Sequence, residues 1–278
     1  MPLKLMYITN RPVVAEIADE AGVDRVFIDL EYIGKEARQF GLDSVKSHHT
    51  VSDALKIKKV LKKAELLVRV NPIHAKYADF CGSDYEINSA INAGADVIML
   101  PMYHSVDEVE KFLKIVDGRA NIMLLAETPG ACDIMKEVVM LPQVDEIHIG
   151  LNDLHLAYHK KFMFELLADG TVDKICSDIK KSNKPFGFGG IARIGYGMLP
   201  AEYIIKEHYR IGSTCAILSR SFCNANKMEN AYEIKDIFEK EIIRIRDAEK
   251  EISALSASEL EKNRLEVIRL TNQIVKTM

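Results

Sequence analysis

Two carboxylates stand where strand-like apolar runs end. Glu127 ends the run that begins at Ile122, and Asp153 follows the run that begins at Ile147. In a parallel α/β barrel the C-terminal ends of the strands surround one mouth, where active sites lie. Hard cations such as Mg²⁺ or Mn²⁺ take one or two carboxylates and leave positions for water and substrate oxygens. The spacing predicts Mg²⁺ or Mn²⁺ on Glu127 and Asp153, with the alternative that both acids only cap helices.

A single arginine, Arg69, lies near the end of another apolar run. Its guanidinium does not deprotonate in proteins, so it needs an anionic partner. It could form a structural ion pair with Asp29 or Glu31. It could instead bind a substrate carboxylate bidentately and stabilise charge on an adjacent oxygen. A cation facing an arginine suits a 2-oxo acid, because the cation can chelate the carboxylate and keto oxygen while the arginine supports an enolate.

The segment from Tyr32 to Thr50 is expected to be a long polar loop above the same barrel end, and such long loops are often functional. His48 or His49 could carry a proton near neutral pH, or both could be solvated loop residues before a helix. His155 and His159 have helical spacing without a third ligand nearby, which favours a helix surface over a zinc site.

Eight short runs rich in Val, Ile and Leu alternate with segments of helical periodicity, including 52–64, 83–93 and 105–116, each of which opens on a serine suited to an N-cap. Continuous apolar strands alternating with helices indicate a parallel sheet covered on both faces. Eight units predict a (β/α)8 TIM barrel, with a doubly wound sheet as the alternative. The expected strands are Leu3–Thr9, Arg25–Glu31, Leu66–Asn71, Asp96–Pro101, Ile122–Glu127, Glu146–Leu151, Pro185–Ile191 and Thr214–Ser219.

Alternation along two of these strands places polar groups on one face. Arg69 and Asn71 share a face of the third strand, and Asp29 and Glu31 share a face of the second. Unpaired charge is costly to bury, so strands with a purely structural role would have little reason to collect it. We therefore expect these side chains to point into the barrel and form a site at its mouth.

Composition excludes several classes of protein. The net charge of −4 with interspersed signs has no resemblance to the basic stripe of a nucleic-acid-binding protein. Five cysteines without a CxxC pair fit reduced thiols in the cytoplasm. No apolar run approaches the roughly 20 residues that span a membrane, and the N-terminus lacks the apolar stretch of a signal peptide. We expect a cytoplasmic protein that contacts neither membrane nor nucleic acid.

The chain divides into a predicted catalytic barrel, residues 1–225, and a charged C-terminal extension, residues 226–278. Two helical apolar faces run through the extension, separated near Ser256 or Ser258, either of which could cap the second helix. The helices could pack on their own barrel, or one could reach a neighbouring subunit in a homo-oligomer.

Five sequence blocks together resemble the HpcH/HpaI aldolase and citrate lyase beta-subunit family, a branch of the phosphoenolpyruvate/pyruvate-type barrels. This resemblance implies a (β/α)8 barrel that makes or breaks carbon–carbon bonds beside a 2-oxo acid, or that splits acyl-CoA esters. It also implies that Glu127 and Asp153 are the metal ligands and that Arg69 holds the enolate and carboxylate. The blocks are Phe27–Glu31, Leu67–Pro72, Gly94–Pro101, Glu127–Pro129 and Ile149–Leu154.

The chain departs from that family at Tyr32. Aldolases of the family carry a proton-transferring histidine directly after the Asp-x-Glu motif, and the citrate-lyase-like branch has an acid there; this chain has tyrosine. Tyr32 could act as an acid with the help of water, or His49 could take over the proton transfer.

The resulting prediction is a metal-dependent carbon–carbon lyase that uses pyruvate or another 2-oxo acid as enolate donor and an aldehyde as its partner. The alternatives are an acyl-CoA lyase or citrate-lyase-like enzyme, and a barrel that binds a metal and metabolite without turnover. The predicted catalytic residues are Arg69, His49 and Tyr32, and the predicted substrate-binding residues are Arg69, Glu127, Asp153, Asp29, Glu31 and Asn71.

Overall fold

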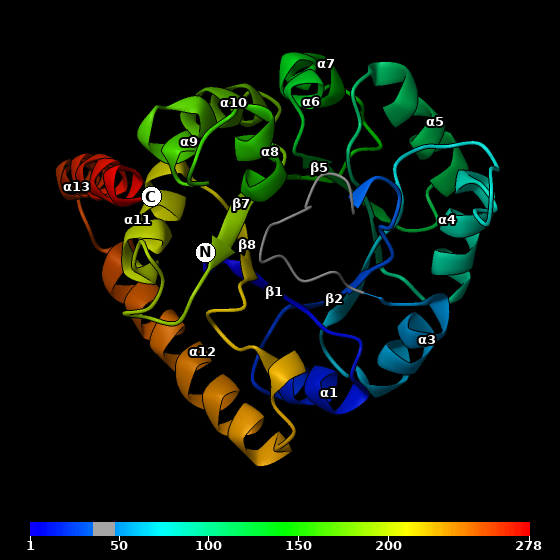
Figure 1. Ribbon diagram of the computed structural model, residues 1–278, viewed down its shortest axis with the longest axis horizontal. Helices are drawn as coiled ribbons and strands as arrows, with labels where there is room; N and C mark the ends of the chain where they lie inside the picture. The colour runs from blue at the N-terminus through cyan, green and yellow to red at the C-terminus, as the bar shows by residue number, and fades with distance from the viewer. Residues whose placement is uncertain (36–47) are drawn as a thin grey trace.

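The computed structural model describes residues 1–35 and 48–278 and has eight parallel strands that close into a barrel in sequence order (Figure 1). The prediction of a (β/α)8 TIM barrel with additional C-terminal helices is therefore confirmed. The strands are β1 (Lys4–Ile8), β2 (Arg25–Asp29), β3 (Glu65–Arg69), β4 (Val97–Leu100), β5 (Asn121–Ala126), β6 (Glu146–Ile149), β7 (Phe186–Ile191) and β8 (Cys215–Leu218).

Helices surround the strands on the outside of the ring (Figure 1). Within the described residues they are α1 (Pro12–Glu20), α3 (Val51–Val60), α4 (Ser83–Asn92), α5 (Val106–Val116), α6 (Pro129–Asp133), α7 (Met135–Val138), α8 (Leu151–Ala157), α9 (Glu165–Ala168), α10 (Thr171–Lys180), α11 (Ala201–Ile211), the 3-10 turn η1 (Ala225–Lys227), α12 (Ala231–Ser253) and α13 (Ala257–Thr277).

Polar caps fix where several helices begin. Ser105 accepts a hydrogen bond from the backbone N–H of Glu108 and caps α5, as its position predicts. Ser256 forms a capping box with Glu259 at the start of α13. The expectation of serine caps at residues 52 and 83 is wrong. Thr50, two residues before Ser52, caps α3 through a capping box with Asp53, and Ser83 is the first residue of α4, whose N-cap is Gly82.

The alternation of side chains along the strands divides the core into two regions. One large cluster joins the outward faces of the strands to the helices. A smaller cluster fills the middle of the barrel and includes Phe27, Leu67, Met99 and Leu125. Since Asp29 and Arg69 lie two residues beyond Phe27 and Leu67, they share the inward face, as strand alternation predicts.

An ion-pair network lies at the opposite end of the barrel. The guanidinium of Arg25, 1% exposed, donates two 2.6 Å hydrogen bonds to the carboxylate of Glu146 and one of 2.7 Å to Glu65. The ammonium of Lys4 lies 3.3 Å from Glu146. Burial would raise the pKa of Glu146, but the hydrogen bonds and charge of Arg25 outweigh burial and lower it. The barrel floor is therefore a closed, charge-balanced layer.

The C-terminal extension lies against the outside of the barrel. Helix α12 contacts α1 and α11, and α13 contacts α9 and α11 (Figure 1). Asn263 on α13 donates a 2.9 Å hydrogen bond to the fully buried carboxylate of Glu207 on α11. The helices of the described residues include none with the length and apolar character needed to cross a membrane.

Candidate functional site at the barrel mouth

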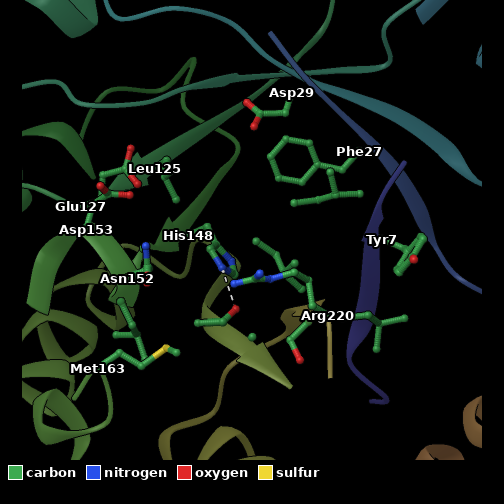
Figure 2. Close-up of a pocket in the computed structure, with 18 of the residues that line it drawn as sticks. Tyr7, Phe27, Asp29, Leu125, Glu127, His148, Asn152, Asp153, Met163 and Arg220 are labelled. Atoms are coloured by element: carbon green, nitrogen blue, oxygen red, sulfur yellow. Dashed lines mark hydrogen bonds between the residues drawn. The ribbon is translucent and has the colours of Figure 1, made fainter. Parts of the chain in front are cut away.

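A cavity of about 520 Å³ lies at the C-terminal ends of the strands (Figure 2). Its wall includes the charged side chains of Asp29, Lys35, Arg69, Glu127, Asp153 and Arg220, which lie at or just beyond the strand ends. The sequence predicted Asp29, Arg69, Glu127 and Asp153 as site residues. The glycines of β7 and the loop after β8, with Arg220, complete the wall on the other side.

Asp29 and Arg69 form a bidentate ion pair across β2 and β3, which places them directly beside each other in the sheet register. Nε and Nη2 of Arg69 donate to the two carboxylate oxygens of Asp29, each at 2.9 Å. Nη2 also lies 3.3 Å from Glu31. Burial would raise the pKa of Asp29, but the charges and hydrogen bonds of Arg69 and Lys35 hold it well below its usual range. This is the ion pair that the sequence left open as one role for Arg69.

Glu127 directly follows β5, and Asp153 lies in the first turn of α8. Both carboxylates are buried, 2% and 9% exposed respectively, and both line the mouth cavity. Figure 2 draws them in the same part of the cavity wall. Glu127 also acts electrostatically on Arg69: burial opposes the charged guanidinium, but Asp29, Glu31 and Glu127 together raise its pKa. Glu127 and Arg69 therefore belong to one electrostatic cluster.

Gly150 leaves the space that the Glu127 carboxylate occupies. A Cβ at this position would lie 2.8 Å from Cβ and 2.8 Å from Oε2 of Glu127, closer than packed atoms approach. The absence of a side chain at residue 150 therefore lets Glu127 turn into the mouth beside α8.

The donor set of this cluster fits a hard divalent cation. Two buried carboxylates are what Mg²⁺ or Mn²⁺ takes from protein when waters and substrate oxygens complete the shell. The described residues contain no group of three or more His, Cys, Asp or Glu side chains arranged to hold a metal. A site made by Glu127 and Asp153 alone therefore depends on oxygen ligands from outside that set.

The two predicted proton carriers line a different cavity. Tyr32, His49 and Asn71 lie on the wall of a smaller space, about 230 Å³, between the β2 and β3 loops and α3 and α4. The hydroxyl of Tyr32 donates to the backbone carbonyl of His49, and Nδ1 of His49 accepts from the backbone N–H of Asp29. Burial lowers the pKa of His49 and raises that of Tyr32.

Asn71 has a supporting position. Its side-chain oxygen accepts hydrogen bonds from the backbone N–H groups of Tyr32, 2.8 Å, and Ile33, 2.9 Å, and its amide donates to Glu86. It thereby fixes the path of the chain after β2. Most of the long polar loop expected between Tyr32 and Thr50 falls at 36–47, outside the described residues.

Lys35 is the mouth residue that sequence reasoning missed. It follows β2 by six residues, is 5% exposed, and places its Nζ 2.5 Å from Oδ2 of Asp29. The strand interiors near the mouth contain no lysine among the described residues; the turn after β2 brings in Lys35, and the segment after α8 brings in the exposed Lys161. A lysine in a polar loop gives no periodic signal, although its position shortly after the Asp-x-Glu motif was visible.

Three other histidines, His148, His155 and His159, lie near the mouth or follow α8. His148, labelled in Figure 2, is a buried inward residue. Its Nε2 lies 3.2 Å from the carbonyl of Gly189, and its Nδ1 lies 3.7 Å from Sγ of Cys215. Burial lowers its pKa to about 4. The expectation that the 155/159 pair lies on a helix surface is wrong for His155, which is buried, whereas His159 follows the end of α8.

Comparison with known proteins identifies one family. The sequence profile described as HpcH/HpaI aldolase/citrate lyase matches residues 4–163, more than half of the chain. No curated protein sequence matches. Among solved structures, an HpcH/HpaI aldolase/citrate lyase family protein from Burkholderia cenocepacia J2315 has a TM-score of 0.61 at 14% identity, covering 81% of this chain and 91% of its own.

Two further structures are similar. An HpcH/HpaI aldolase from Desulfitobacterium hafniense DCB-2 has a TM-score of 0.60 at 14% identity and covers 86% of this chain and 93% of its own. A macrophomate synthase has a TM-score of 0.56 at 14% identity and covers 78% and 77%. At these identities the structures show a shared fold.

Proposed function

Because this chain belongs to the HpcH/HpaI aldolase/citrate lyase family, we propose that it is a metal-dependent carbon–carbon lyase with pyruvate or another 2-oxo acid as enolate donor. The observation that carries the proposal is the cluster of Glu127, Asp153 and Arg69 on the wall of one cavity. Two acids and one fixed cation at a barrel mouth match the needs of an enolate: positive charge beside a developing oxyanion, and a pocket that limits water.

Glu127 and Asp153 would hold the divalent cation, which supplies positive charge beside the keto oxygen when bound. Arg69 would contribute a second positive group. Its Nε and Nη2 are engaged with Asp29 and Glu31, whereas Nη1 has no hydrogen-bond partner within residues 1–35 and 48–278. Nη1 is therefore the nitrogen that can donate to a substrate carboxylate or enolate oxygen.

Asp29 and Glu31 would act through Arg69. Their carboxylates fix the plane of the guanidinium, so its donor direction is set before a substrate arrives. Preorganised donors of this kind lower the barrier because they need not reorient as charge develops. Asp29 and Glu31 therefore belong to the substrate-binding group as orienting residues.

The test is aldol chemistry with and without metal. The purified protein, stripped with EDTA, is assayed with pyruvate and a panel of short aldehydes before and after addition of Mg²⁺ or Mn²⁺. We expect carbon–carbon bond formation or cleavage that depends on added metal, and its near-complete loss in Glu127→Gln with an unchanged unfolding temperature. Turnover of an acyl-CoA ester without aldol activity would move the assignment to the citrate-lyase-like branch. The absence of both activities would contradict the proposal.

A further inference from the structure

Lys35 is buried in the wall of the mouth cavity, and its ion pair with Asp29 alone does not require that position. It is buried at 5% exposure, lines the same cavity as Arg69 and Glu127, and has Asp29 as its single hydrogen-bond partner within the described residues. Asp29 already receives two hydrogen bonds from Arg69. An ammonium group has three N–H donors, and within residues 1–35 and 48–278 Asp29 takes one of those on Lys35.

Other proton-carrying side chains on the cavity wall have other engagements. The hydroxyl of Tyr7 donates to a backbone carbonyl at 2.9 Å. Both ring nitrogens of His148 have partners, and Nδ1 of His155 contacts a carbonyl of its own helix. Lys161 is exposed. Tyr32 and His49 lie on the smaller cavity, whereas Lys35 lines the mouth and shares Asp29 with Arg69.

We propose, on the basis of the proposed lyase function, that Lys35 is the residue that transfers the proton to and from the methyl carbon of the 2-oxo acid. In the cleavage direction the Lys35 amine takes the proton of the C4 hydroxyl as the C3–C4 bond breaks. C4 becomes the carbonyl carbon of the aldehyde, and the electron pair of the broken bond passes into the enolate. The Lys35 ammonium formed in this way gives the proton to C3, which becomes the methyl group. The lysine is then an amine again, so one proton enters and one leaves per turnover.

The half-reaction isolates this step from the aldehyde. Pyruvate is incubated in D₂O with Mg²⁺ and the wild-type protein, and loss of the methyl proton signal is followed by NMR. Lys35→Arg keeps the charge beside Asp29 but cannot release a proton near neutral pH, whereas Lys35→Met removes both properties. Lys59→Met, an exposed lysine on α3, is the matched control. Pyruvate affinity and thermal unfolding are measured for each variant.

We expect both Lys35 variants to lose exchange by at least about 100-fold, the range typical of a lost general acid–base group. Lys35→Arg should keep its unfolding temperature and bind pyruvate within about threefold of wild type. If Lys35→Arg instead exchanges protons at nearly the wild-type rate, Lys35 only balances charge and the proposal is overturned. If the wild-type protein neither binds pyruvate nor exchanges its protons, the lyase function itself fails.

Discussion

Arg69 holds Asp29 through two parallel hydrogen bonds of 2.9 Å, formed between residues that are direct neighbours in the register of β2 and β3. The sheet itself thus sets the position of the guanidinium. A bidentate arginine–carboxylate pair fixes orientation as well as charge, which a lysine ammonium cannot reproduce.

Arg69→Lys should therefore lower turnover far more than it lowers stability. The lysine keeps the charge but loses the planar fork that Asp29 orients, so we expect kcat to fall by roughly 10²–10³, as for a lost oxyanion donor. Steady-state kinetics and thermal unfolding check this. Equal kcat in Arg69→Lys and wild type would mean that the guanidinium has only a structural role.

Gly150→Ala should weaken metal binding. The new Cβ would lie 2.8 Å from the Glu127 carboxylate and push it out of position. Perturbing a residue that orients a ligand commonly reduces metal affinity about 10–100-fold. Mn²⁺ titration followed by electron paramagnetic resonance measures the affinity directly. Unchanged Mn²⁺ affinity in a folded Gly150→Ala protein would argue against Glu127 as a ligand.

The ion pair of Arg25 and Glu146 should make the barrel sensitive to acid. The pKa of Glu146 is lowered in the folded state, so the folded protein binds fewer protons than the unfolded chain. The stabilisation that this shift gives the folded protein is present above the pKa of a glutamate in the unfolded chain, about 4.3. It is lost as the pH falls below that value. Denaturant unfolding between pH 7 and 3 should show this loss.

Glu146→Gln leaves the Arg25 charge buried without its full partner and should cost on the order of 3–5 kcal/mol at pH 7. The same variant should lose less stability than wild type between pH 5 and 3, because the titrating carboxyl is gone. A wild-type acid transition that Glu146→Gln leaves unchanged would show that other carboxyls control it.

His148 should remain neutral through the physiological range. Burial lowers its pKa to about 4, and Nε2 lies beside a carbonyl, which favours the tautomer protonated there. Nitrogen-15 NMR should show a neutral imidazole from pH 7 to pH 5, with the signal assigned by its loss in His148→Gln. Because the unfolded histidine has a pKa of about 6.5, this group also removes stability as pH falls from there toward 4. Protonation near pH 6.5 in the folded protein would contradict the burial argument.

Much of the fold was predictable because the buried strands of a parallel sheet have continuous apolar sequences. Seven of the eight strands lie within or beside a run of Val, Ile and Leu, the exception being the glycine- and phenylalanine-rich β7. The alternation through Phe27 and Leu67 correctly placed Asp29 and Arg69 inside. Glu127 and Asp153 were found because they stand where such runs end.

The segment after β2 could not be read in the same way. The directions of Tyr32 and His49 depend on hydrogen bonds to distant or backbone groups, among them the amide of Asn71, and these leave no periodic pattern. The position of Lys35 depends on the same turn. The residue types of this segment suggest polar chemistry, but tertiary contacts decide which of its side chains faces the mouth.

The layer of Arg25, Glu65 and Glu146 has a consequence for stability rather than for kinetics. None of these three residues lines the mouth cavity. A substitution in this layer should therefore change the free energy of unfolding and leave the release of products from the cavity unaltered.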